Sequence, residues 1–249
     1  MKISVITATF NSADTIKDAL DSVAQQSYSN IEHLIIDGQS KDTTLDIVKN
    51  YSNSKMHFRS ESDSGIYDAL NKGIIYSSGD VVGFLHADDV FESNGVLSTI
   101  AEAFSDPNVD AIYGDLIYVR KENIQQVVRY WRAGNYRKNS FYHGWMLPHP
   151  TLYVRRAVYE KYGGFNTSYR ISADYDLVLK MFTRPGFRAT YIPDVLVKMR
   201  LGGVSNGSLR QVLRKSSEDY RILRAHGVGG WLSLVAKNIR KLSQFRGRP

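Results

Sequence analysis

Two adjacent aspartates follow a short apolar segment of this chain. Residues 81–85 have the sequence Val-Val-Gly-Phe-Leu, which predicts a buried strand, and His86-Ala87-Asp88-Asp89 comes directly after it. Two carboxylates at the end of a buried strand are costly unless a cation meets them. The usual cation is a divalent metal with oxygen ligands, often bound to a phosphorylated substrate. The stretch therefore suggests an enzyme that acts on a nucleotide diphosphate compound.

Polar residues also follow three other predicted strands. They are Thr7–Asn11 after the first, Asp37 after the second and Glu61–Asp63 after the third. In open α/β sheets, ligands bind at the carboxyl ends of the strands. Loops are polar in any case, which accounts for the serines and asparagines. The general polarity of loops accounts less well for acids that directly follow apolar strands, so we expect a site at the carboxyl edge of the sheet.

Strands and helices alternate in the first hundred residues. The strands are predicted over residues 2–9, 31–36, 55–60 and 81–85. One helix is predicted to begin with N-cap residues 11–14 and run to about residue 26, a second to begin at 40–42, and a third to cover 64–77. This alternation predicts a mostly parallel sheet with helices on its faces.

The pattern changes after residue 107. Residues 111–119 and 125–131 predict antiparallel strands, and 132–150 an irregular loop beside a site. Further strands are predicted over 151–154 and 187–199, the latter as one long strand or a pair. Further helices are predicted over 155–162, 173–182 and 211–226, and an amphipathic helix after residue 230.

Composition limits the partners of the chain. Its 249 residues are 43% apolar and include no cysteine, so any metal must be held by oxygen or imidazole ligands. Residues 198–249 hold 12 Lys or Arg and two acids, whereas residues 1–197 carry a net charge of −3. An acidic body argues against a nucleic-acid-binding surface, and a basic tail fits an anionic surface. With neither a signal peptide nor a long apolar segment, we expect a soluble, cytoplasmic chain.

Several ordered motifs resemble the family 2 glycosyltransferases, which have the GT-A fold and act in bacterial surface polysaccharide synthesis. The matching stretches are residues 5–11 (Val-Ile-Thr-Ala-Thr-Phe-Asn), 36–44 (Ile-Asp-Gly-Gln-Ser-Lys-Asp-Thr-Thr), 63–73 (Asp-Ser-Gly-Ile-Tyr-Asp-Ala-Leu-Asn-Lys-Gly), 84–89, 172–176 and 200–205. The resemblance implies a GT-A-like α/β domain over residues 1–205, with a Rossmann-type, mostly parallel sheet. Its nucleotide-binding half would be 1–105 and its acceptor-binding half 106–205, and 206–249 would form a basic helical extension.

The resemblance also implies a reaction. A sugar would pass, with inversion, from a nucleotide diphosphate sugar (UDP-sugar favoured) to a hydroxyl of a saccharide acceptor that is lipid-linked. Asp88 would bind Mn²⁺ or Mg²⁺, with Asp89 as the alternative ligand. His86 stands where the family has an aspartate, and it either hydrogen-bonds the ribose or has no role.

The general base implied by the family is Asp174. It would take the proton from the acceptor hydroxyl, and Asp176 is its rival. The family usually has an acidic pair at this place, and Ala173 replaces the first member. An alternative is that Asp174 only places negative charge at a helix N-terminus.

The remaining site residues are also carried over from the family. Those expected to contact the nucleotide sugar are Thr7, Thr9, Asp37, Asp63, Asn71, Lys72, His86 and Asp89, and those on the acceptor or diphosphate side are His149 and Arg200. Alternatives remain open for three of them. Asp37 could cap a helix, Lys72 could pair with Asp68 four residues earlier, and His149 could be structural.

The tail carries an amphipathic helix. Its apolar face comprises Trp231, Leu232, Val235, Ile239, Leu242 and Phe245, and the nearby basic residues are Lys237, Arg240, Lys241, Arg246 and Arg248. Such a helix can lie in an anionic membrane interface, which would make the protein peripheral on the inner face of the cytoplasmic membrane. The alternative is that this face packs on the catalytic domain or on a second copy in a homo-oligomer.

Two rival functions stay open. One is a sugar-nucleotide-binding or membrane scaffold with little catalysis, which the His86 and Ala173 departures favour. The other is a nucleotidyltransferase, which would ordinarily have a glycine-rich basic loop after its first strand. Residues 7–11 contain neither glycine nor lysine, so this second rival ranks lower.

Overall fold

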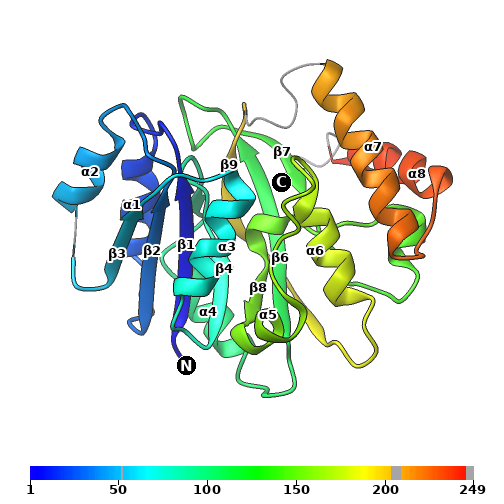
Figure 1. Ribbon diagram of the computed structural model, residues 1–249. Helices are drawn as coiled ribbons and strands as arrows, with labels where there is room; N and C mark the ends of the chain where they lie inside the picture. The colour runs from blue at the N-terminus through cyan, green and yellow to red at the C-terminus, as the bar shows by residue number, and fades with distance from the viewer. Residues whose placement is uncertain (52, 203–208, 245–249) are drawn as a thin grey trace.

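A single mixed sheet runs through the protein. The computed structural model describes residues 1–51, 53–202 and 209–244. Within them the strands pair in the order β3-β2-β1-β4-β8-β6-β9-β5, and β7 pairs with β6 beside this path (Figure 1). The predicted boundary at residue 205 lies outside the described residues, as do Gly203, Val204 and Ser205 of the last family motif.

The elements follow one another along the chain as follows. The strands are β1 (Ile3–Thr9), β2 (Ile31–Asp37), β3 (Met56–Ser60), β4 (Val81–Phe84), β5 (Val90–Phe91), β6 (Ala111–Val119), β7 (Val127–Trp131), β8 (Tyr153–Arg155) and β9 (Ala189–Arg200). The helices are α1 (Ile16–Ala24), α2 (Thr44–Tyr51), α3 (Ile66–Tyr76), α4 (Val96–Ala103), α5 (Arg156–Tyr162), α6 (Ala173–Phe182), α7 (Leu209–Ala225) and α8 (Trp231–Ser243), with 3₁₀ turns at Ser140–His143 and His149–Thr151.

The first half of the sheet is parallel, as predicted. Strands β3, β2, β1 and β4 pair in parallel. β1 is buried along its whole length, with Ile3 and Val5 packed beside residues of α1 and α4, and Ile6 beside residues of α3. α3 comes so close to β1 that a Cβ at Gly73 would lie 2.4 Å from Ile6 Cγ2, which only glycine permits. All four parallel strands thus end at one edge.

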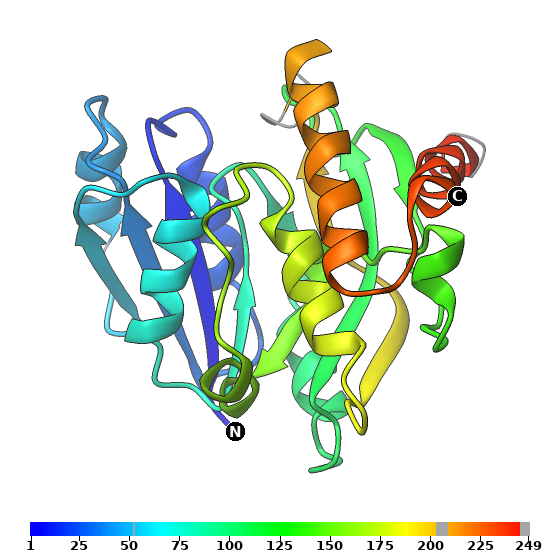
Figure 2. The ribbon, with the colours of Figure 1, turned by 45° about the vertical axis from the view of Figure 1, so that its right-hand side comes forward.

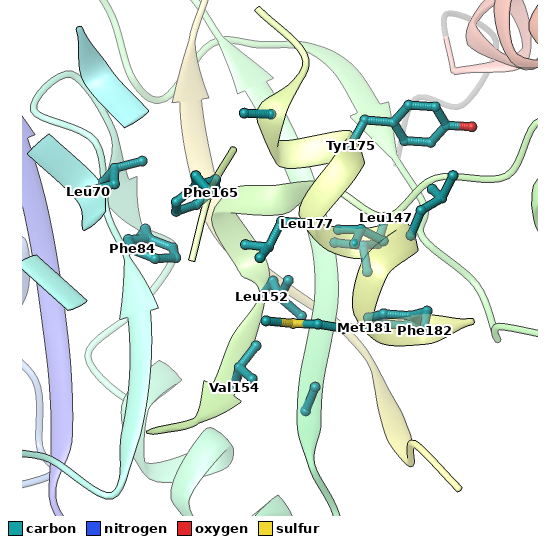
Figure 3. Close-up of a cluster of buried hydrophobic side chains, with 14 of the residues drawn as sticks. Leu70, Phe84, Leu147, Leu152, Val154, Phe165, Tyr175, Leu177, Met181 and Phe182 are labelled. Atoms are coloured by element: carbon teal, nitrogen blue, oxygen red, sulfur yellow. The ribbon is translucent and has the colours of Figure 1, made fainter. Parts of the chain in front are cut away.

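The second half of the sheet is mixed. β8 is antiparallel to β4 and to β6, β7 is antiparallel to β6, and β9 is parallel to β6. The predicted α/β class is confirmed, but the sheet is less parallel than the first hundred residues indicated, because β8 runs antiparallel between β4 and β6 and because β6 and β7 are joined directly as the predicted antiparallel pair. The core behind this half packs Phe84, Phe165, Leu177 and Met181 between the sheet and α6 (Figure 3).

Two elements were not predicted, and one helix begins later than expected. β5 has only two residues, which pair with β9, and α4 buries Val96, Leu97 and Ile100. α1 begins at Ile16, because the predicted N-cap residues bond the next loop instead. The main-chain N–H of Asn11 donates to Ser40 Oγ, and the Asn11 side chain accepts from the N–H of Lys41.

Residues 209–243 fold as two helices, α7 and α8, on the side of the protein where α6 lies. α7 runs beside α6, and α8 lies farther from the first half of the sheet (Figures 1 and 2). Among the described residues, no helix combines the length and apolarity needed to cross a membrane.

Candidate active site

Three side chains that the sequence predicted separately form one hydrogen-bonded row. His86 Nε2, after β4, lies 3.1 Å from His149 Nε2, in the 3₁₀ turn before β8. His149 Nδ1 lies 3.1 Å from Asp174 Oδ2, in the first turn of α6. The row connects the 86–89 turn with a helix from the other half of the chain, over 88 residues of sequence. The His149 and Asp174 side chains keep 28% and 19% of their exposure, so substrate can reach them.

The charge state of this row follows from its burial. Burial, together with the smaller effect of the neighbouring His149, lowers the pKa of His86 to about 3, so His86 is neutral. Burial by itself would raise the pKa of Asp174. The attraction and hydrogen bond of His149, helped by Lys215 and Lys237, outweigh burial and leave this pKa below its usual range. Asp174 is therefore a carboxylate at neutral pH.

The two aspartates of the 86–89 turn have different environments. Asp88 is partly exposed, and among the described residues its carboxylate hydrogen-bonds only its own main chain. Asp89 is fully buried, its Oδ1 accepts the N–H of Arg200 at 3.2 Å, and its Oδ2 has no partner. Burial and the nearby Asp88 raise the pKa of Asp89 well above its ordinary value. Burial also raises the pKa of Asp88, against the attraction of Arg200 and Lys121, but of the two carboxyl groups only that of Asp88 is partly exposed to solvent.

Arg200 lies beneath this turn. Its guanidinium donates to the main-chain oxygen of Asp88 at 2.7 Å and forms an ion pair with Asp18 of α1. Only 5% of Arg200 is exposed, so its cation is used inside the protein to hold the turn. A contact with substrate phosphate stays a prediction.

Several predicted nucleotide-binding residues are bonded within the protein. Thr7 is buried with its hydroxyl 2.9 Å from His33 Nε2, and Thr9 is buried with its hydroxyl unpartnered. Asp37 is fully buried, and its carboxylate accepts from the main chain of Ser40 and from the hydroxyls of Ser40 and Ser60. Asp37 therefore anchors the turn after β2, rather than the start of α2.

The 63–73 segment is likewise tied to its own surroundings. Asp63 accepts the N–H of Gly65 at 2.9 Å. Asn71 bonds both the N–H and the C=O of Phe165, at 2.8 and 2.9 Å, which fastens α3 to the loop before α6. Lys72 Nζ lies 3.6 Å from Asp68 Oδ2, which is the pairing that the sequence offered as the alternative. Contacts of these residues with a nucleotide stay predictions.

A comparison with known families decides the class of the protein. The model of glycosyl transferase family 2 matches residues 4–163, more than half of the chain. The chain belongs to glycosyl transferase family 2. It is a glycosyltransferase, and the match covers β1 to α5 and includes His86, Asp88 and His149.

Two curated relatives of this glycosyltransferase are mycobacterial proteins. A PGL/p-HBAD biosynthesis glycosyltransferase of Mycobacterium bovis (strain BCG / Pasteur 1173P2) is 29% identical over 208 residues, covering 82% of this chain and 78% of the relative. An uncharacterized glycosyltransferase of Mycobacterium tuberculosis is 32% identical over 187 residues, covering 72% of this chain and 68% of the relative.

Solved structures share the fold. S. aureus TarS 1–349 in complex with UDP-GlcNAc superposes with a TM-score of 0.67 at 18% identity, over 92% of this chain and 66% of that one. The mannosyltransferase PcManGT from Pyrobaculum calidifontis, in complex with GDP-Man and Mn²⁺, gives 0.65 at 18% identity, over 100% of this chain and 76% of that one. This chain thus spans slightly less than two thirds of TarS 1–349, and the GT-A fold is shared.

Two residues of this glycosyltransferase site were not predicted. The hydroxyl of Tyr67 lies 2.6 Å from the main-chain oxygen of Ile171 and 3.3 Å from Asp174 Oδ1. Glu218 of α7 is buried and accepts the main-chain N–H groups of residues 170–172, at 2.9–3.2 Å, just before Asp174. Tyr67 lies within the family motif at residues 63–73, and this membership could have indicated a role in the site. Glu218 had none beyond being one of two acids in a basic tail.

The departure at Ala173 has a structural reason. Ala173 is fully buried as the first residue of α6 and belongs to the core, where a carboxylate would be costly. The rival base, Asp176, is buried on another side of α6 with its Oδ1 2.9 Å from His226 Nε2. Of the two aspartates, only Asp174 belongs to the row with His86.

Proposed function

We propose that this glycosyltransferase moves a sugar, with inversion, from a nucleotide diphosphate sugar to a hydroxyl of a lipid-linked saccharide, in the synthesis of a bacterial surface polysaccharide. Asp174 would take the proton from the acceptor hydroxyl while its oxygen attacks the anomeric carbon. The observation that carries this proposal is the row His86–His149–Asp174, which brings an ionised carboxylate to the turn that bears Asp88. A single displacement from the face opposite the diphosphate inverts the anomeric configuration.

A divalent cation, Mn²⁺ or Mg²⁺, fits the oxygen of Asp88. Its carboxylate is partly exposed and not engaged by other described side chains, whereas Asp89 is enclosed. The described residues contain no group of three His, Asp or Glu side chains that could hold a metal alone. Magnesium is commonly bound by one or two carboxylates together with substrate phosphates, so Asp88 suffices. The metal, when bound, would neutralise charge on the departing diphosphate.

A donor panel tests the reaction. We expect the protein with Mn²⁺ to be stabilised in thermal unfolding by one class among UDP-, GDP- and dTDP-sugars, with UDP-sugars favoured because TarS has been solved with UDP and UDP-GlcNAc. The same donor should release its nucleoside diphosphate slowly to water and faster with acceptor. Stabilisation without any release, for every donor and metal, would instead support the scaffold function.

Membrane association is supported by the unusual orientation of α8. Four of its apolar side chains are largely exposed, with Trp231 at 65%, Leu232 at 64%, Val235 at 45% and Ile239 at 60% exposure. Exposure of this extent favours a partner outside the described chain over packing on the catalytic domain, the alternative that the sequence left open. Of the predicted face, Leu242 and Phe245 lie outside the described side chains, as do Lys241, Arg246 and Arg248.

Polar residues of α8 point inward instead. Ser233 and Lys237 are buried, and Lys237 Nζ lies 2.8 Å from Asp219 Oδ2 of α7 and 3.3 Å from the ring centre of Tyr175. A buried charge that loses its partner costs about 3–5 kcal/mol, so this pair resists rotation of α8. The apolar face is thereby held outward.

Charge indicates an anionic lipid surface as the partner of this face. Both acids of the tail, Glu218 and Asp219, are buried, each with 2% exposure. The exposed charges of the described part of α7 and α8 are all basic: Arg210, Arg214, Arg221, Arg224 and Arg240. A Trp-bearing apolar face with basic neighbours suits the interface of a membrane that carries anionic lipids.

Vesicle binding measures this association. Co-sedimentation of the protein with phosphatidylcholine vesicles should rise when phosphatidylglycerol is included. The double variant Trp231→Ser with Ile239→Ser should lower vesicle partitioning by about tenfold or more, because burying a large apolar side chain is worth about 1.5–3 kcal/mol. Ile75→Ser, at an apolar position on α3 that is 76% exposed, is the matched control. If the pair leaves vesicle binding intact but abolishes a concentration-dependent dimer, the face binds a second copy instead.

A further inference from the structure

The bond between His149 and Asp174 has a defined direction. An ionised carboxylate can only accept hydrogen bonds, so His149 Nδ1, 3.1 Å from Asp174 Oδ2, must carry the proton. The other nitrogen of the ring, Nε2, lies 3.1 Å from His86 Nε2, and one of these two atoms donates to the other. The imidazole of His149 is thus held at both ends.

The second oxygen of Asp174, Oδ1, has only a long hydrogen bond within the described chain. The only described neighbour that hydrogen-bonds Oδ1 is the hydroxyl of Tyr67, at 3.3 Å. That hydroxyl has a single proton, and its shorter contact, 2.6 Å, is with the main-chain oxygen of Ile171. Oδ1 is therefore free to accept a hydrogen bond from a substrate, whereas Oδ2 is occupied.

We propose that His149 is a positioning residue for Asp174, and that His86 fixes the ring of His149. His149 holds Oδ2 so that Oδ1 faces the acceptor hydroxyl. During transfer the hydroxyl proton passes to Oδ1, and the hydroxyl oxygen bonds to the anomeric carbon. The bond from this carbon to the diphosphate oxygen breaks, leaving its electron pair on the diphosphate. The inference rests on the proposed function, and it extends that function by assigning His149 a role through Asp174.

The inference also accounts for the histidine at position 86. With an aspartate there, as in the family, His149 would lie between two carboxylates that both accept hydrogen bonds from it. The imidazole of His86 supports the ring of His149 without competing with Asp174 for a negative partner. His86, which replaces the family's aspartate, and His149 thus act together on Asp174, although 63 residues of sequence separate the two histidines.

Two amide substitutions separate the two ends of the His149 ring. His149→Asn keeps an N–H at the place of Nδ1, toward Asp174, and loses the contact with His86. His149→Gln keeps a group at the place of Nε2, toward His86, and loses the donor to Asp174. We expect His149→Gln to lower kcat by about 10–100-fold with little change in donor KM, because misplacing a catalytic group by about 1 Å costs up to about 100-fold. His149→Asn should retain most of the activity.

A second histidine that pairs with an aspartate of α6 serves as the control for stability. His226 pairs with Asp176 of α6 at 2.9 Å, as His149 pairs with Asp174. His226→Ala should loosen α6 yet leave kcat near its original value. Equal losses in His149→Asn and His149→Gln, or a loss only in His149→Asn, would overturn the positioning role, as would an equal loss in His226→Ala.

A spectroscopic measurement tests the bond without turnover. In ¹H–¹⁵N spectra of the histidine rings, His149 should show a proton on Nδ1 with a downfield shift that disappears in Asp174→Ala. A neutral ring protonated on Nε2 alone would refute the inference. If no donor in the panel is turned over while this signal is present, the proposed function fails and the hydrogen bond stands.

Discussion

Replacing Asp174 by asparagine is expected to lower sugar transfer by about 10²–10⁴-fold, the usual contribution of a general base. The amide has nearly the same shape but cannot take a proton. Asp174 is ionised in the protein because His149 holds its pKa down against the effect of burial. Donor binding should persist in this variant, since the proposed metal ligand lies on a different element, the 86–89 turn.

Release of nucleoside diphosphate, with and without acceptor, measures this effect, and calorimetric titration with donor checks binding. Asp176→Asn is the matched control, because Asp176 lies on the same helix, is buried and pairs with His226. It should transfer sugar at nearly the original rate. A large loss in Asp176→Asn with none in Asp174→Asn would move the base to the rival residue.

Replacing Asp88 by asparagine is expected to remove the stimulation of transfer by Mn²⁺ or Mg²⁺. A metal that stabilises developing charge contributes several kcal/mol, and a loss of about 3–4 kcal/mol corresponds to about 10²–10³-fold in rate. Asparagine keeps an oxygen but loses the charge that a hard divalent cation requires. Metal titrations of transfer rate, in the unmodified protein and in Asp88→Asn, measure the effect.

Asp89→Asn distinguishes the two adjacent aspartates. Burial raises the pKa of Asp89 well above its ordinary value, and its Oδ1 accepts the N–H of Arg200. An amide oxygen accepts the same bond, so metal stimulation should survive in Asp89→Asn. If Asp89→Asn abolishes the stimulation while Asp88→Asn retains it, the metal ligand is Asp89, and the buried environment must open when donor binds.

Much of the fold was predictable because its signals are local. The apolar segments of β1, β2 and β4 and the helical spacing in α3 and α6 were all correctly assigned to strands and helices. β5 has two residues, too few for any periodicity, and is a strand only because it meets β9. α4 carries a local amphipathic pattern in Val96, Leu97 and Ile100, although this helix was not among those predicted.

The site was less predictable than the fold. Position at a strand end indicated a site at the edge where His86 and Asp88 lie, but it does not say where a side chain points. Thr7 lies near the end of β1 and Asp37 ends β2, and within the protein Thr7 bonds His33 while Asp37 bonds Ser40 and Ser60. Which polar group turns toward a substrate depends on the partners that folding supplies, and these come from distant segments.

By itself, the sequence determined the α/β class, the family, the acidic 86–89 turn and the amphipathic character of the tail. These properties follow from composition, local spacing and short motifs, which survive without any long-range contact. Only the tertiary structure joined His86, His149 and Asp174, and only it decided that α8 turns its apolar face outward, with Lys237 against Asp219. A buried charge or imidazole takes its orientation from its partner, and only folding brings that partner, which is distant in sequence, into contact.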